Sequence, residues 1–149
     1  MNPLQKYLLV VASLLATGFS TEPDPPLAVH PVDPGVVWSP CPPIFPQGCE
    51  LTVLHGNPGQ PGADVFLRVP PGYVLPSHSH TSAEHMMLAT GRLTVKYSGA
   101  PETTLTSGAY AYGPAGLPHR GACVGDEACV LFIAFDGPVD ANAYTGSLD

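Results

Sequence analysis

GYVLPSHSHTSAEHMMLATG, residues 72–91 of the 149-residue chain, carries three histidines and a glutamate between two glycines. His78 and His80 are two residues apart, and Glu84 follows four residues later. Side chains at even spacing on a β-strand share a face, so we expect these three to project together into one interior. Two imidazoles and a carboxylate that converge in this way form most of a divalent-metal site.

The alternative for this stretch is that His78 and His80 are core histidines satisfied by backbone groups. Two imidazoles on one strand face beside Glu84 would be costly to bury unpaired, which favours the metal interpretation. Met86 and Leu88 have the same parity as Glu84, so we expect them to line an apolar pocket wall.

His85, within this stretch, and Tyr110 and Tyr112, after it, are further candidates for the site. His85 has the opposite parity to Glu84, so we expect a packing or surface role for it. Tyr110 and Tyr112 share a face and either line the pocket or cover the exterior of the fold; the sequence leaves both open.

Composition and turn spacing predict an all-β domain. The chain holds 19 prolines and 16 glycines, which favours short strands separated by turns. Residues 98–107 are expected to be a loop. The predicted strands, separated by turns at regular intervals, indicate a sandwich or barrel and cover residues 51–55, 63–69, 92–97, 108–112, 119–123 and 129–135.

The N-terminus predicts export. Lys6 precedes an apolar run over residues 7–16, and the small residues Gly18 and Ser20 follow, which is typical of a signal peptide cleaved after Ser20. A membrane anchor is the alternative, but the apolar run falls short of the roughly 20 residues that span a bilayer. We therefore expect a secreted or periplasmic protein.

The net charge of −7 argues against nucleic acid and anionic membrane surfaces as partners, since both require basic patches. The expected organisation is a signal peptide over 1–20, a proline-rich extended arm over 21–48, one folded domain over 49–136 and a tail over 137–149. The two ends are expected to lie outside the core.

Four cysteines fit an oxidising compartment. Cys41 and Cys49 bracket a proline-rich loop, whereas Cys123 and Cys129 bracket a predicted hairpin turn. Two local disulfides are the favoured interpretation, although four cysteines allow three connectivities and buried free thiols are a further alternative. The spacing is not that of a zinc knuckle or a redox motif.

The sequence resembles the cupin family at two motifs. The first, G-x5-H-x-H-x3-4-E-x6-G, is matched at every fixed position by Gly72, His78, His80, Glu84 and Gly91. The second, G-x5-P-x-G-x2-H-x3-N, is matched by Gly108, Pro114, Gly116 and His119, with Cys123 in place of the asparagine. The sequence also resembles small exported single-domain cupins. Since Cys123 has the parity of His119, it either faces the site or pairs with Cys129, and we favour the pair.

The resemblance implies a cupin jelly-roll β-barrel that binds one divalent transition metal (Fe, Mn, Ni, Cu or Zn) through His78, His80, Glu84 and His119. Four protein ligands on an octahedral ion leave two positions for water, dioxygen or a bidentate substrate. The family also implies a proton-transfer role for Glu84 and a homodimer formed through strand edges.

Cupins host many reactions as well as noncatalytic binders, so the fold does not name the function. We expect a metal-dependent enzyme, dioxygenase-like, acting on a small organic molecule. The alternatives are a noncatalytic metal-dependent binding or sensory protein and a structural barrel stabilised by its metal. Substrate and metal identity are left open by the sequence.

Overall fold

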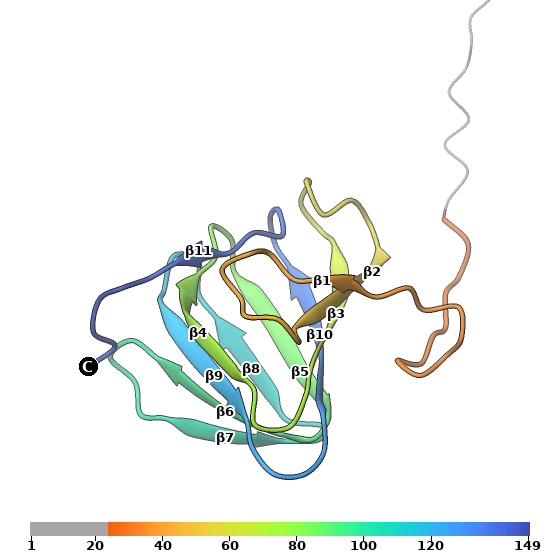
Figure 1. The fold of residues 1–149 in the computed structure, drawn as a ribbon. Coiled ribbons are helices and arrows are strands. Elements are labelled where there is room, and N and C mark those ends of the chain that lie inside the picture. Colours follow the sequence, from red (N-terminus) through yellow and green to blue (C-terminus); the bar gives the residue numbers. More distant parts are fainter. Residues whose placement is uncertain (1–23) are drawn as a thin grey trace, which may run out of the picture.

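The computed structural model describes residues 24–149, so the predicted signal peptide lies outside the described residues. This part of the chain is all-β and contains no helix (Figure 1). Within it, no helix has the length and apolar character needed to span a membrane. The strands are β1 (Ser39–Pro40), β2 (Glu50–His55), β3 (Asp64–Val69), β4 (Val74–Ser79), β5 (Glu84–Thr90), β6 (Arg92–Tyr97), β7 (Thr103–Thr106), β8 (Tyr110–Gly113), β9 (His119–Cys123), β10 (Cys129–Phe135) and β11 (Asn142–Ala143).

The strands form two antiparallel sheets that face each other as a jelly-roll barrel (Figure 1). One sheet has the order β1-β2-β3-β10-β5-β8, and the other has the order β11-β4-β9-β6-β7. In the first sheet β10 lies between β3 and β5, and in the second sheet β9 lies between β4 and β6. The predicted all-β jelly roll is confirmed.

The core lies between the sheets and is mainly aliphatic. In β10, the central strand CVLFIAF, Leu131, Ile133 and Phe135 face the interior and are buried. Leu88 and Leu93 reach it from β5 and β6 and are 0% and 2% exposed. Burying each such side chain contributes roughly 1.5–3 kcal/mol, so this core supports the barrel around a polar site.

Residues 72–91 form two strands, so the prediction that His78, His80 and Glu84 lie on one face of a single strand is wrong. β4 ends at Ser79, the chain reverses, and β5 begins at Glu84. His78 and His80 share a direction, as their even spacing predicts. Glu84 reaches the same interior from a strand of the opposite sheet.

The prediction of a loop over residues 98–107 is also wrong in part, because β7 occupies Thr103–Thr106 and pairs with β6. Threonine favours strands, and Leu105 is the one apolar side chain that β7 buries. Short strands on both sides of residues 49–136 also join the sheets: β1 pairs with β2, and β11 pairs with β4. Leu148 is buried, contrary to the expectation that the C-terminal end stays outside the core.

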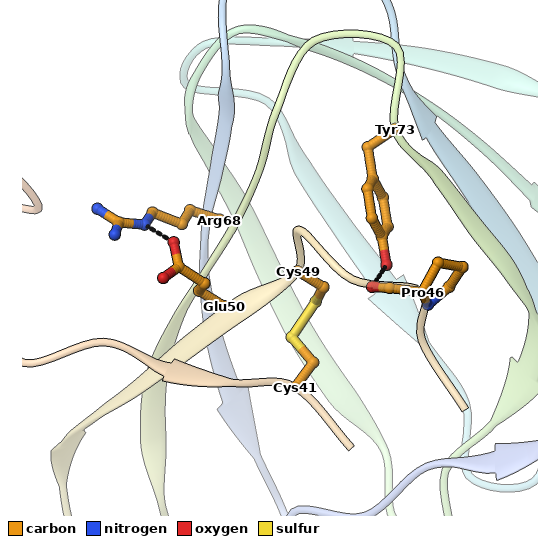
Figure 2. Close-up of a disulfide and its surroundings, with 6 residues drawn as sticks. All are labelled: Cys41, Pro46, Cys49, Glu50, Arg68 and Tyr73. Carbon is orange, nitrogen blue, oxygen red and sulfur yellow. Dashed lines mark hydrogen bonds and ion pairs between the residues drawn. A yellow bond between two sulfur atoms is a disulfide. The ribbon is translucent and has the colours of Figure 1, made fainter. Parts of the chain in front are cut away.

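All four cysteines form disulfides, which confirms the predicted local pairs. Cys41 is joined to Cys49 and Cys123 is joined to Cys129. The alternatives of free thiols and of other connectivities are thereby excluded. Figure 2 shows the first disulfide closing the loop between β1 and β2.

Candidate metal centre

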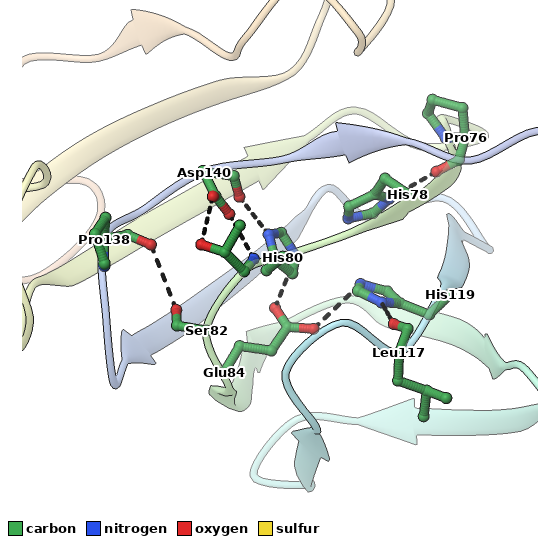
Figure 3. Close-up of polar contacts among 10 residues, drawn as sticks. Pro76, His78, His80, Ser82, Glu84, Leu117, His119, Pro138 and Asp140 are labelled. Atoms are coloured by element: carbon green, nitrogen blue, oxygen red, sulfur yellow. Dashed lines mark hydrogen bonds and ion pairs between the residues drawn. The ribbon is translucent and has the colours of Figure 1, made fainter.

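Three histidines from two adjacent strands meet inside the barrel. His78 on β4 lies opposite His119 at the start of β9, and His80 follows the end of β4. One ring nitrogen of each lies within 4.8 Å of the others. The three side chains are buried, at 5%, 8% and 6% exposed for His78, His80 and His119. Figure 3 shows the three rings turned toward a common point.

Backbone carbonyls hold each imidazole in the same tautomer. His78 Nδ1 donates to Pro76 O at 2.7 Å, His119 Nδ1 donates to Leu117 O at 3.3 Å, and His80 Nδ1 donates to Asp140 O. A carbonyl only accepts, so each Nδ1 carries the proton. Each Nε2 is therefore left with a free lone pair, which is the state in which imidazole binds a metal.

Glu84 completes this group from the opposite sheet. Its side chain is 2% exposed, with Oε1 3.1 Å from His119 Nε2 and Oε2 3.4 Å from His80 Nε2. Because both Nε2 atoms lack a proton, neither donates, and Oε1 has no hydrogen-bond partner among residues 24–149. An unpaired buried acceptor costs about 1–3 kcal/mol, and a cation at this point would satisfy all four groups. The donor set therefore fits a divalent metal.

Burial sets the protonation of the metal-free site. It lowers the pKa of His78 to about 4 and that of His119 to about 3, and it lowers the pKa of His80 as well. Burial raises the pKa of Glu84 to about 8. At neutral pH the three imidazoles are thus neutral, while the carboxyl carries a proton that a metal has to displace.

A cavity of about 60 Å³ adjoins the four groups. Met86 lines it, as predicted from its parity, whereas Leu88 is fully buried in the core beside it and does not line it. Most of the lining is apolar and includes Phe45, Leu51, Leu67, Leu75, Met86, Leu93, Val95, Leu131, Ile133, Phe135 and Val139.

Asp140 is a site residue that the sequence reasoning missed. Besides the carbonyl contact to His80, its carboxylate accepts hydrogen bonds from Thr81 N at 2.9 Å and from Thr81 Oγ1 at 2.6 Å. These contacts fix the turn between β4 and β5, and with it the ring of His80 (Figure 3). Asp140 stands 60 residues after His80, so no local pattern signals the contact.

Tyr97 is a second residue that was missed. Its ring centroid lies 5.1 Å from that of His119, and β6 places it opposite that histidine. Its hydroxyl is buried without a hydrogen-bond partner in the described part of the chain, and burial raises the pKa of the phenol. The hydroxyl is a donor that a buried water would satisfy.

Other candidates from the sequence lie on the outside of the barrel. His85 Nδ1 and the Tyr110 hydroxyl are 2.7 Å apart on the outer face, and Tyr112 packs beside them. Tyr110 and Tyr112 are 57% and 48% exposed, so they cover the exterior and do not line the pocket. Cys123 is held in its disulfide with Cys129.

Residues 65–135 match the model of the cupin domain, which spans both strands that carry the histidines and also the strand of Glu84. Residues 65–135 form a cupin domain. No curated protein matches the chain in sequence.

Solved structures with cupin folds are similar in shape and distant in sequence. A chain from the crystal structures of the DMSP lyases RdDddP and RnDddQII is 20% identical, with a TM-score of 0.65, over 74% of this chain and 63% of that chain. An RmlC-like cupin from Shewanella frigidimarina NCIMB 400 is 18% identical, with a TM-score of 0.58, over 70% and 86%. Bacillus subtilis oxalate decarboxylase, described with Mn(II) centres, is 24% identical, with a TM-score of 0.53, over 62% and 26%. The chain thus spans less than two thirds of the lyase chain, and these likenesses show the fold.

Proposed function

We propose that this cupin is an exported enzyme that binds one divalent transition metal through His78, His80, Glu84 and His119 and acts on a small organic molecule. The observation that carries the proposal is the convergence of three inward Nε2 lone pairs on the buried carboxyl group of Glu84. Mixed imidazole and carboxylate ligands suit Fe, Mn, Ni, Cu or Zn. The Mn(II) centres named for a protein of the same fold are in keeping with this range.

The reaction class that we put forward is oxidation of the substrate by dioxygen, and the bound metal would supply Lewis acidity and dioxygen activation. The chain's own contribution is a cavity whose aliphatic wall excludes water and orients the substrate. Glu84 would transfer a proton only when its carboxylate leaves the metal, since burial raises the pKa of the unligated carboxyl to about 8.

Two observations support export. The N-terminal 20 residues have the features of a signal peptide, and both disulfides fit an oxidising compartment. In this proposal the mature chain starts at residue 21, with the cupin domain over 49–136 between a proline-rich arm and a C-terminal tail. Association into a homodimer through strand edges belongs to the same proposal.

Oxygen uptake tests the reaction class. The metal-loaded protein is mixed with phenolic, diketone and thiol compounds while dissolved oxygen and substrate are followed together. We expect a substrate to be consumed with stoichiometric oxygen. Turnover without oxygen uptake would replace oxidation by a lyase or decarboxylase reaction, and tight binding without turnover would identify a binding or sensory protein.

Metal binding should release about one proton per chain near pH 7. Glu84, with a pKa raised to about 8, holds a proton that the metal displaces, whereas the imidazoles of His78 and His119 are already neutral. Affinity should therefore rise with pH up to about 8 and level off above it. Calorimetric titration with Mn(II) in two buffers of different ionisation enthalpy measures the proton count. The Glu84→Gln protein, which has no carboxyl proton to lose, should release close to none, and an equal release from both proteins contradicts the assignment.

A further inference from the structure

The cavity beside the four candidate ligands is closed by two segments that do not belong to the main strands. Cys41, Pro42 and Phe45 line it from the loop between β1 and β2, and residues 139–141 line it from the tail. In Figure 1 the loop crosses the barrel near β4 and β5. The loop precedes residues 65–135, the part that matches the cupin model.

Phe45 is the large side chain that this loop places against the site. It is half-buried, and its ring meets that of His78 edge to face with a centroid distance of 4.9 Å. It also packs against the hydrophobic core. The ring therefore limits the space next to one of the candidate ligands.

Several contacts fix the position of the loop. The disulfide joins Cys41 to Cys49, and Cys41 N donates to Cys49 O at 3.1 Å. The Tyr73 hydroxyl donates to Pro46 O at 2.5 Å, directly after Phe45 in the chain (Figure 2). A short closed loop held at three points keeps a side chain in place at little further cost in entropy, which is what a size-selecting wall requires.

The remaining charges around the cavity exclude a polyanionic ligand. Arg120 is the one Lys or Arg residue in the lining; its side chain is 54% exposed and lies 3.8 Å from Glu102. No other fixed positive charge lines the cavity within the described residues, so a phosphate or a second carboxylate would be buried uncompensated.

We propose that Phe45 is a specificity-determining residue: it restricts the site to compact, largely apolar molecules that carry one pair of metal-chelating oxygens. The inference rests on the proposed function, because the oxygen pair would occupy the two positions that four protein ligands leave open. Shortening Phe45 opens space beside His78, so larger apolar substituents should then fit.

Binding of two hydroxamates to the Co(II)-loaded protein tests the inference, with the visible Co(II) spectrum as the readout. Acetohydroxamate and benzohydroxamate chelate a metal through the same pair of oxygens. The first carries a methyl substituent and the second a phenyl substituent. The wild type should bind acetohydroxamate at least about 10-fold more tightly. Phe45→Ala should gain about 10-fold for benzohydroxamate and stay within about twofold for acetohydroxamate, since a few added carbons in an apolar pocket change binding by about 10–200-fold.

Phe132→Ala is the matched control, because Phe132 lies on the outer face of β10, away from the cavity. It should keep the wild-type preference. Phe45→Leu, which preserves most of the packing, should give an intermediate preference. If Phe45→Ala takes up Co(II) and still prefers acetohydroxamate over benzohydroxamate as the wild type does, the inference is overturned while the proposed function stands. If the wild type takes up no Co(II), the proposed function itself fails.

Discussion

Replacing His119 with alanine should abolish stoichiometric metal binding while the protein remains folded. His119 is the one candidate ligand on β9, and its Nε2 is the nitrogen nearest to Glu84 Oε1, at 3.1 Å. The loss of affinity should exceed about 100-fold, because even an outer partner of a metal ligand is worth about 10–100-fold. The fold should persist, since the aliphatic core and both disulfides are untouched.

His85→Ala is the matched control for His119→Ala. His85 directly follows Glu84 but lies on the outer face, where it contacts Tyr110. This variant should keep the full metal content. Elemental analysis reports metal per chain, and circular dichroism of the metal-free proteins reports folding. One equivalent of metal retained by His119→Ala, or lost by His85→Ala, would contradict the assignment of the site.

Gly113→Ala should weaken metal binding by about 10–100-fold although it changes no candidate ligand. Gly113 on β8 lies opposite Glu84, and a Cβ there would be 2.6 Å from Glu84 Oε1 and 2.7 Å from its Cγ. The carboxylate has to move away from the histidines, and misplacing one ligand lowers affinity. Overpacking at this buried contact should also cost about 1–3 kcal/mol of stability.

Gly35→Ala is the control for this substitution, because no atom lies within 4 Å of a Cβ at position 35. Its metal affinity and denaturation midpoint should equal those of the wild type. Calorimetric metal titration and urea denaturation of both variants make the comparison. If Gly113→Ala bound metal as tightly as the wild type, Glu84 would not be a ligand in the geometry described above.

The sequence predicts those parts of the protein that local patterns encode. The run CVLFIAF marks the central strand β10, and the two motifs identify the four side chains that meet inside the barrel. Spacing alone was misleading for Glu84, because a reversal between Ser79 and Glu84 moves it to the opposite sheet.

Contacts between residues far apart in the chain could not be predicted from the sequence. Phe45 reaches His78 from a loop far earlier in the chain, and Asp140 reaches His80 from the tail. Nothing in the residues around Phe45 or Asp140 indicates these partners, since the barrel itself brings them together. The strand at Thr103–Thr106 was missed because it has one buried apolar residue and otherwise reads as polar loop.

The central claim is that three histidines and Glu84 hold a metal, and the metal content of the mature protein tests it most directly. The protein is purified without chelators after expression under conditions that form both disulfides, beside a His78→Ala/His80→Ala variant. We predict about one equivalent of Fe, Mn, Ni, Cu or Zn per chain in the wild type and none in the variant. Metal-free wild-type protein, with a melting temperature that added metals leave unchanged, would contradict the account.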